Sequence, residues 1–190
     1  MTYDALIIGG GQAGLALGYH LRLAGLRFAI LDAHRRVGDA WRHRWDSLTL
    51  FTPRRYDGLP GLPFPGDPDG HPGKDEVADY LKAYAERFAL PVHLGCHVTS
   101  VRPDGERLLV ETSARMYTAA RVVVAAGAFH TPRTPAFASG LDPHVTQLHS
   151  SRYLRPEQLP LGVGWAGDAR TLADRLSATA IDPGKTLIAP

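Results

Sequence analysis

A glycine-rich turn between a short apolar run and a helical pattern constrains the fold more than any other stretch of this sequence. Residues 5–8 are apolar and β-branched enough to form a buried parallel strand. Gly9, Gly11 and Gly14 follow at once, with the spacing G-x-G-x-x-G. Residues 12–24 then mix leucines with alanine and glycine in a helical pattern. This order of strand, glycine turn and helix predicts the start of a βαβ unit.

Each glycine of the turn has a physical reason. Gly9 permits the tight exit from the strand, and Gly11 lets a pyrophosphate approach the backbone because it has no side chain. Gly14 allows the helix to pack close to the sheet. The first helical residues, Gln12 and Ala13, offer free N–H groups at the positive end of the helix dipole. The stretch therefore predicts a dinucleotide site.

A second apolar strand, expected over residues 26–31, ends in an acidic residue. Asp32 lies where a carboxylate can accept hydrogen bonds from the hydroxyls of a ribose. Gly25, just before this strand, is placed to end the preceding helix. Because strand, turn, helix, strand and acid occur in the expected order, we prefer a nucleotide site over a plain glycine turn.

Downstream, the pattern predicts an ordered loop, one amphipathic helix and several short strands. The Pro- and Gly-rich stretch 53–73 fits neither a helix nor a central strand. Residues 74–88 place apolar side chains on one face of a helix and acids in its first turn. Four short strands, expected at residues 92–94, 97–101, 108–112 and 116–118 with a turn at 103–105, suggest a small β-meander. Two more strands are expected at residues 121–125 and 145–149. The strand at 121–125 is expected to be buried and to end where backbone can approach a ligand.

Composition limits the classes of function. The chain has 190 residues, 44% of them hydrophobic, and 21 basic residues against 19 acidic ones, so nothing indicates binding to nucleic acid or to a charged membrane surface. The single cysteine, Cys96, excludes an internal disulfide and a redox pair, and the scattered histidines predict no metal site. No apolar run reaches the roughly 20 residues of a membrane span, and the first strand leaves no room for a signal peptide. We therefore expect a cytoplasmic protein.

Together these stretches resemble the group B flavin-dependent monooxygenases, which include the flavin-containing and Baeyer–Villiger types. The resemblance extends from residue 1 to about residue 158. It implies an α/β fold, namely a Rossmann-like FAD-binding domain with a parallel sheet and a small β-meander. It also implies FAD as the cofactor, with its diphosphate on Gly9, Gly11 and Gly14. The family usually has Glu where this chain has Asp32.

Shorter motifs add to the resemblance. Residues 37–41, V-G-D-A-W, are similar to the family's G-G-x-W element with one glycine replaced by Asp39, and residues 48–53 resemble the segment that runs under the flavin. Residues 97–98 resemble the strand that meets the adenine, and residues 125–127 the family's A-T-G. The resemblance thus implies further cofactor contacts from Ala33, Arg35, Gly38, Trp41, Leu50, Thr52, His97, Val98, Ala125, Ala126 and Gly127. The F-x-G…H-x-x-x-Y signature of the family is similar to the set Phe137, Gly140, His149 and Tyr153.

The chain departs from the family after residue 158. Family members are about twice as long and place an NADPH-binding domain within the FAD domain. Residues 161–168 can be aligned with the beginning of that domain or with the final helix of the FAD domain. We prefer the second alignment because it closes the fold. It implies a single FAD-binding domain over residues 1–190, with the NADPH domain absent or vestigial at 161–190, and a helix starting at Gly167 and Asp168 beside the flavin.

Two classes of function remain open. The first is a flavoprotein oxidoreductase, monooxygenase-like, that acts on a small organic substrate with O2; its reductant would be external NADPH, a partner reductase or the substrate. The second is a non-catalytic or partner-dependent module that binds FAD or another nucleotide. No catalytic residue is predicted, because the cofactor carries this chemistry. An open strand edge also suggests a homodimer.

Overall fold

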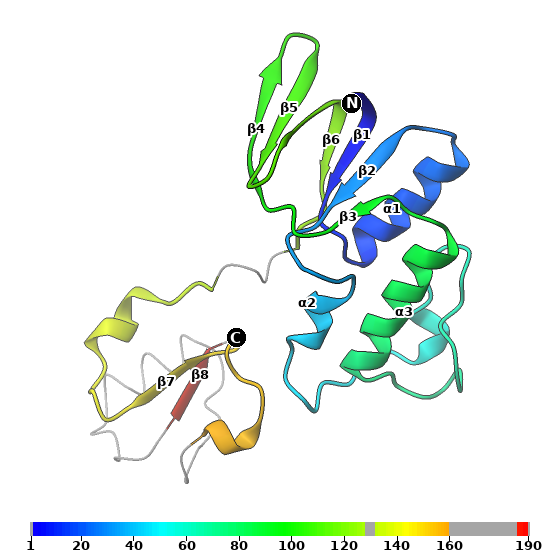
Figure 1. Cartoon of the computed structure of the whole chain (residues 1–190). Helices are drawn as coiled ribbons and strands as arrows, with labels where there is room; N and C mark the ends of the chain where they lie inside the picture. Colours follow the sequence, from blue (N-terminus) through cyan, green and yellow to red (C-terminus); the bar gives the residue numbers. More distant parts are fainter. Residues whose placement is uncertain (1, 128–131, 160–185, 190) are drawn as a thin grey trace. The chain divides into compact units, whose positions relative to one another are not determined.

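The computed structural model describes residues 2–127, 132–159 and 186–189, and the chain divides into two compact units. Unit 1 comprises Met1–His43 and Ser47–Gly127, and unit 2 comprises Arg44–Asp46 and Ala128–Pro190. Figure 1 shows both units.

Unit 1 is built on a six-stranded sheet with the order β3-β2-β1-β6-β5-β4. The pairs from β3 to β6 are parallel, whereas β6-β5 and β5-β4 are antiparallel. The predicted α/β class, with a Rossmann-like parallel sheet and a small meander, is confirmed. The strands are β1 (Thr2–Ile8), β2 (Phe28–Leu31), β3 (Val92–His93), β4 (Val98–Asp104), β5 (Arg107–Thr112) and β6 (Met116–Val124).

Three details of the predicted strands are wrong. β3 joins the parallel sheet beside β2 and is not part of the meander. The strands expected at 116–118 and 121–125 form one strand, β6, because its residues pair with β1 continuously from Thr118 to Val124. The expected turn at 103–105 is displaced, since Pro103 lies within β4 and pairs with Leu108. β4 is the edge strand of the sheet, where a residue without an N–H is tolerated.

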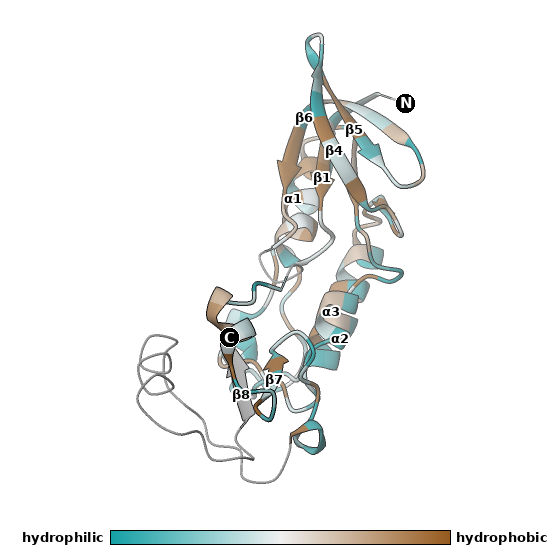
Figure 2. Ribbon diagram, turned by 90° about the vertical axis from the view of Figure 1, so that its left-hand side faces the viewer, coloured by the Kyte–Doolittle hydropathy of each residue, from teal (hydrophilic) through white to brown (hydrophobic). Residues whose placement is uncertain are grey.

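The end of β6 is less buried than predicted. β5 pairs with β6 only as far as Ala119, so the residues beyond it have β1 as their single sheet neighbour within unit 1. Val123 and Val124 are accordingly exposed, Val124 to 72%. Figure 2 shows this strand as a hydrophobic stretch beside β1.

Two long helices cover one face of the parallel strands. α1 (Gln12–Leu23) and α3 (Lys74–Arg87) contribute buried side chains to a core with residues of β1 and β2. The predicted helix at 74–88 is confirmed, and its apolar face is buried as expected. Gly25 adopts a left-handed φ of 68° after α1, which suits a glycine at a helix end.

The Pro- and Gly-rich loop packs against α3 as an ordered segment. It contains the 3-10 helix η1 (Arg54–Tyr56), and its Phe64 is buried and stacks on Tyr80 with ring centroids 4.5 Å apart. The hydroxyl of Tyr80 accepts a hydrogen bond from the N–H of Leu59, and the hydroxyl of Tyr84 donates one to the carbonyl of Pro60. Backbone groups of the loop therefore find partners on the helix.

The opposite face of the sheet carries a second core with a polar cluster at its margin. Leu6, Leu31 and Val110 are buried there. The hydroxyl of Tyr117 lies 3.1 Å from Nδ1 of His93 and receives a hydrogen bond of 2.6 Å from Nε of Arg115. Burial lowers the pKa of His93, and the positive charge of Arg115 lowers it further.

Unit 2 contains short elements. β7 (Thr146–His149) confirms the strand expected at 145–149, and it forms a parallel pair with β8 (Thr186–Ala189), which was not predicted. The 3-10 helices of this unit are η2 (Ala136–Gly140) and η3 (Pro156–Gln158). The N–H of Asp46 donates to the carbonyl of Leu154 over 2.7 Å, which ties residues 44–46 to this unit. Among the helices that the structure describes, none combines the length and the apolar character that a membrane crossing requires.

We expect the His93 cluster to make stability depend on pH. A histidine whose folded pKa lies below its ordinary value of 6.5 contributes stability that is complete above pH 6.5 and is lost as pH falls through the folded pKa. His93→Asn should therefore reduce the loss of unfolding free energy between pH 7.5 and pH 5, measured by urea denaturation. The matched control His20→Asn, at an exposed position, should leave the loss unchanged. Equal effects of the two variants would contradict the prediction.

Candidate functional site

The glycine turn lies at the carboxyl end of β1, against the end of β6. Gly9 has a left-handed φ of 109°, and a Cβ there would lie 2.4 Å from the carbonyl oxygen of Ala125. A Cβ on Gly14 would lie 1.9 Å from the carbonyl oxygen of Gly9. The N–H of Ala125 donates to the carbonyl of Ile8 over 2.7 Å. The structure thus brings the predicted Gly-rich turn and the predicted Ala-Ala-Gly segment together, and only glycine fits at positions 9 and 14.

Gly11 differs from its neighbours because its missing side chain faces open space. A Cβ at this position would meet no atom within 4 Å. Gly11 is the residue that precedes α1, and no side chain caps that end or places an acid in its first turn. By contrast, α3 carries Asp75 and Glu76 in its first turn, and Glu76 accepts a hydrogen bond from the N–H of Gly73. The start of α1 therefore has no capping side chain among the described residues, and N–H groups at such a helix start can bind an anion.

Asp32 anchors the turn from the neighbouring strand. Its Oδ2 accepts a hydrogen bond of 2.6 Å from the N–H of Gly10, and its Oδ1 lies 2.8 Å from both the backbone N and Nδ1 of His34. Three donors thus occupy a carboxylate that offers about four acceptor sites. The remaining acceptor position, on Oδ2, has no donor among the described residues.

The predicted adenine strand begins beside Asp32. The N–H of Cys96 donates to the carbonyl of Asp32, and the N–H of Gly95 to the carbonyl of His34, each over 2.8 Å. His97 is exposed, while Val98 is partly buried against the second core. The backbone of these two predicted residues therefore lies next to the carboxyl end of β2.

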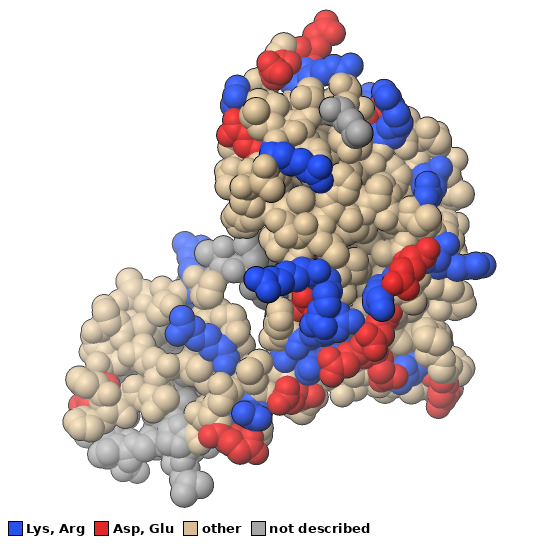
Figure 3. All heavy atoms as spheres, in the orientation of Figure 1, with Lys and Arg blue, Asp and Glu red and all other residues tan. Residues whose placement is uncertain are grey.

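The basic loop that follows Asp32 is held together by the carboxylate of Asp39, which lies within the loop. α2 (Asp39–Arg42) follows Gly38, whose φ is 88° and whose missing Cβ would lie 2.5 Å from the carbonyl oxygen of Ala78. Burial acts to raise the pKa of Asp39, but hydrogen bonds and ion pairs with Arg36 and Arg42 hold this pKa below its ordinary value. Two of the loop's arginines are therefore engaged with Asp39. Figure 3 shows acidic and basic side chains interspersed on this part of the surface.

The other predicted contact residues are dispersed over unit 1. Trp41 and Leu50 pack against the first core, and the hydroxyl of Thr52 donates to Asp57. Arg35 and Ala33 are exposed, and Arg35 makes no hydrogen bond or ion pair with the residues that the structure describes. Ala126 and Gly127 are exposed at the end of β6. The predicted helix start at Gly167 and Asp168 lies outside the described residues.

Two residues of the site were missed by the sequence analysis. Gly10 donates its N–H to Asp32, and a Cβ there would lie 2.8 Å from Oδ2 of that residue. The run of three glycines was a signal that this middle position also excludes a side chain. His34 was indicated by its spacing, because an aspartate commonly accepts a hydrogen bond from the N–H two residues later.

The arrangement suits the binding of a dinucleotide better than acid–base chemistry. Helix N–H groups, one carboxylate and exposed backbone converge at the carboxyl ends of β1, β2 and β6, where open α/β sheets bind ligands. Within residues 2–127, 132–159 and 186–189, no three His, Cys, Asp or Glu side chains gather closely enough to hold a metal ion.

The fold and this turn define a Rossmann-like α/β domain of the kind that binds dinucleotides. Residues 6–158 match the model of the pyridine nucleotide-disulphide oxidoreductase family, so the chain belongs to that family. An uncharacterized CzcO-like oxidoreductase of Geobacillus kaustophilus is 48% identical over 92% of this chain and 51% of its own length. Indole-3-pyruvate monooxygenase YUCCA1 of Oryza sativa subsp. japonica is 32% identical over 81% of this chain and 39% of its own length.

Solved structures agree with these relatives. A flavin-containing monooxygenase from Stenotrophomonas maltophilia superposes with a TM-score of 0.80 at 38% identity, covering 85% of this chain and 49% of its own. The resemblance to flavin-dependent monooxygenases is thereby confirmed. The chain spans about half the length of the curated relatives that it matches first.

Substitutions of Gly14 and Gly11 should separate the packing role of the turn from its role in binding. We expect Gly14→Ala to lower the free energy of unfolding by about 2 kcal/mol, because its methyl group overlaps the carbonyl of Gly9. Gly11→Ala should cost less than about 1 kcal/mol, since its methyl group meets open space and only the preference for glycine before a helix is lost. Chemical denaturation measures both. A Gly11 variant as unstable as the Gly14 variant would refute this assignment.

Proposed function

We propose that this chain binds FAD at the carboxyl ends of β1, β2 and β6 and acts in a flavin-dependent oxidation of a small organic substrate with O2. The observation that carries the proposal is the uncapped start of α1 at Gly11, set between Asp32 and the end of β6. The residues present fit an adenine dinucleotide, because a Cβ on Gly11 would fill space that a pyrophosphate needs.

Each part of the site has an assigned role. The N–H groups of Gln12 and Ala13, with Gly11 beside them, would bind the pyrophosphate at the positive end of α1. The free acceptor position of Asp32 would bind a ribose hydroxyl, and Gly10 and His34 hold the carboxylate in place for it. The backbone at His97 and Val98 would border the adenine, and the exposed backbone of Ala126 and Gly127 would border the rest of the cofactor.

FAD, when bound, supplies the redox chemistry of the reaction. The chain itself binds and orients the cofactor through backbone donors and one carboxylate. Its glycines bring backbone into contact range, and the two cores fix the strands that carry them. No side chain at the turn is placed to transfer a proton, so the protein's contribution here is positional.

The names of two similar proteins support the proposed monooxygenase activity. YUCCA1 is named an indole-3-pyruvate monooxygenase, and the Stenotrophomonas protein a flavin-containing monooxygenase. External NADPH, a partner reductase or the substrate itself would deliver the electrons. The substrate would be a small organic molecule.

A second candidate is a non-catalytic or partner-dependent FAD-binding module. The observation that favours it is the make-up of the site, in which backbone N–H groups and the carboxylate of Asp32 suit a nucleotide while no side chain at the turn is placed to transfer a proton. In that case FAD binding would persist without turnover by this chain alone.

The binding of FAD tests the common element of both candidates. We expect the protein, titrated with FAD, to quench the flavin fluorescence, and Asp32→Asn to weaken the affinity roughly tenfold or more, because a charged acceptor of a hydroxyl is lost. The control Asp4→Asn removes the same charge near the amino end of β1 and should leave the affinity unchanged. Wild-type protein that is folded but does not bind FAD would exclude the proposal.

Turnover separates the two candidates. With FAD bound and NADPH and O2 supplied, the flavin-dependent oxidoreductase should oxidise NADPH faster than the same concentration of free FAD, measured at 340 nm. The Gly11→Ala variant, which keeps its fold but loses the close approach of the pyrophosphate, should fall to the rate of free FAD. A rate equal to that of free FAD in the wild-type protein, with FAD firmly bound, would favour the module.

A further inference from the structure

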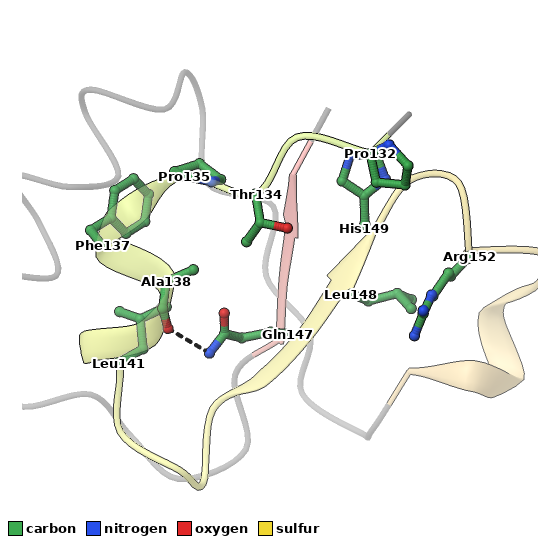
Figure 4. Close-up of a pocket in the computed structure, with 10 residues that line it drawn as sticks. All are labelled: Pro132, Thr134, Pro135, Phe137, Ala138, Leu141, Gln147, Leu148, His149 and Arg152. Atoms are coloured by element: carbon green, nitrogen blue, oxygen red, sulfur yellow. Dashed lines mark hydrogen bonds between the residues drawn. The ribbon is translucent and has the colours of Figure 1, made fainter. Parts of the chain in front are cut away.

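Unit 2 contains a hollow of about 380 Å³ between η2, β7 and the loop before η2. Its apolar lining includes Phe137, Leu141 and Leu148. Figure 4 shows Thr134 and Gln147 between η2 and β7, and Arg152 extending toward Leu148. The volume lies at the lower end of the range for small-molecule sites, which corresponds to a ligand with one ring or a short alkyl chain.

The wall of the hollow is held in shape by a hydrogen bond. Nε2 of Gln147 donates to the carbonyl of Ala138 over 2.9 Å, so the amide ties β7 to η2 (Figure 4). Ala138 is buried, whereas Phe137, on the same short helix, is 40% exposed. A large aromatic side chain that is left partly open beside a hollow offers apolar surface to a ligand.

Arg152 supplies a positive charge at this apolar wall. Its guanidinium makes no ion pair or hydrogen bond with the described residues, although its backbone N–H donates to the carbonyl of His149. Asp142, Glu157 and Asp46 are the described acids of unit 2, and none of them lines the hollow. Among the described residues, no acid neutralises the charge of Arg152, and a guanidinium in this situation can bind an anion.

His149 adds a polar group to the same lining. Its Nδ1 accepts a hydrogen bond of 3.1 Å from the N–H of Ser151 and lies 2.9 Å from Oγ of that residue, so Ser151 engages this nitrogen. Nε2 is the other hydrogen-bonding nitrogen of the ring. The hydroxyl of Thr134 is a further polar group of the lining.

We propose that this hollow binds a small amphipathic monocarboxylic acid, with its carboxylate on Arg152 and its apolar body against Phe137, Leu141 and Leu148. A carboxylate matches one guanidinium in charge and in its two parallel acceptors. A phosphate dianion would be less well matched, because Arg152 is the single arginine or lysine among the described residues of the lining. This site lies within unit 2 and does not depend on the binding of FAD.

The probe for the test is 3-phenylpropionate, compared with its uncharged amide by isothermal titration calorimetry on the full chain. We expect the wild-type protein to bind the acid at least about tenfold more tightly than the amide, and Arg152→Gln to abolish this preference. Thr134→Trp, which fills the hollow from an exposed position, should abolish the binding of both compounds.

The matched control is Arg133→Gln, which removes a charge from an exposed position beside Thr134 but outside the lining. It should keep the preference for the acid. The proposal is overturned if folded wild-type protein does not bind the acid, if acid and amide bind equally, or if Arg133→Gln weakens binding as much as Arg152→Gln. Tighter binding of phenyl phosphate than of the acid would also overturn it.

Discussion

The structure of unit 1 depends on a close approach of backbone to backbone at the end of β1. The carbonyl of Gly9 lies where a side chain of Gly14 would be, and the carbonyl of Ala125 lies where a side chain of Gly9 would be. These contacts fix the start of α1 against the ends of both β1 and β6. Because the helix starts there, its free N–H groups point to the place where the parallel strands end. Packing and binding are thus consequences of the same missing side chains.

The starts of the two long helices, α1 and α3, differ in how their backbone N–H groups are satisfied. In α3, Glu76 accepts a hydrogen bond from the N–H of Gly73, the residue before the helix, whereas α1 begins at Gly11 without a capping side chain among the described residues or an acid in its first turn. Asp32 stabilises the turn by accepting from Gly10 and keeps one acceptor position without a donor among the described residues. Nearby, Asp39 binds Arg36 and Arg42, so these arginines hold the loop together.

Much of unit 1 could be predicted from the sequence where the signal is local. The order of strand, glycine turn, helix, strand and acid, and the amphipathic helix at 74–88, follow from spacing and period. The errors concern long-range pairing. The two residues of β3 read like a strand of the meander, but they pair with β2. The predicted break in β6 is missing because β1 pairs along its whole parallel part, and Pro103 continues β4 because that strand is at the edge.

The sequence by itself determined the βαβ unit, since steric freedom at glycine, helix period and the position of an acid after a strand act within a few residues of one another. Only the tertiary structure decided which strand neighbours which, and that the N–H of Gly10 lies on the carboxylate of Asp32. It alone brought together the loop, the short helix and the strand that line the hollow beside Arg152. The strand pairings join residues that are distant in sequence, and the free energy that selects among them comes from burial in the whole sheet and its cores.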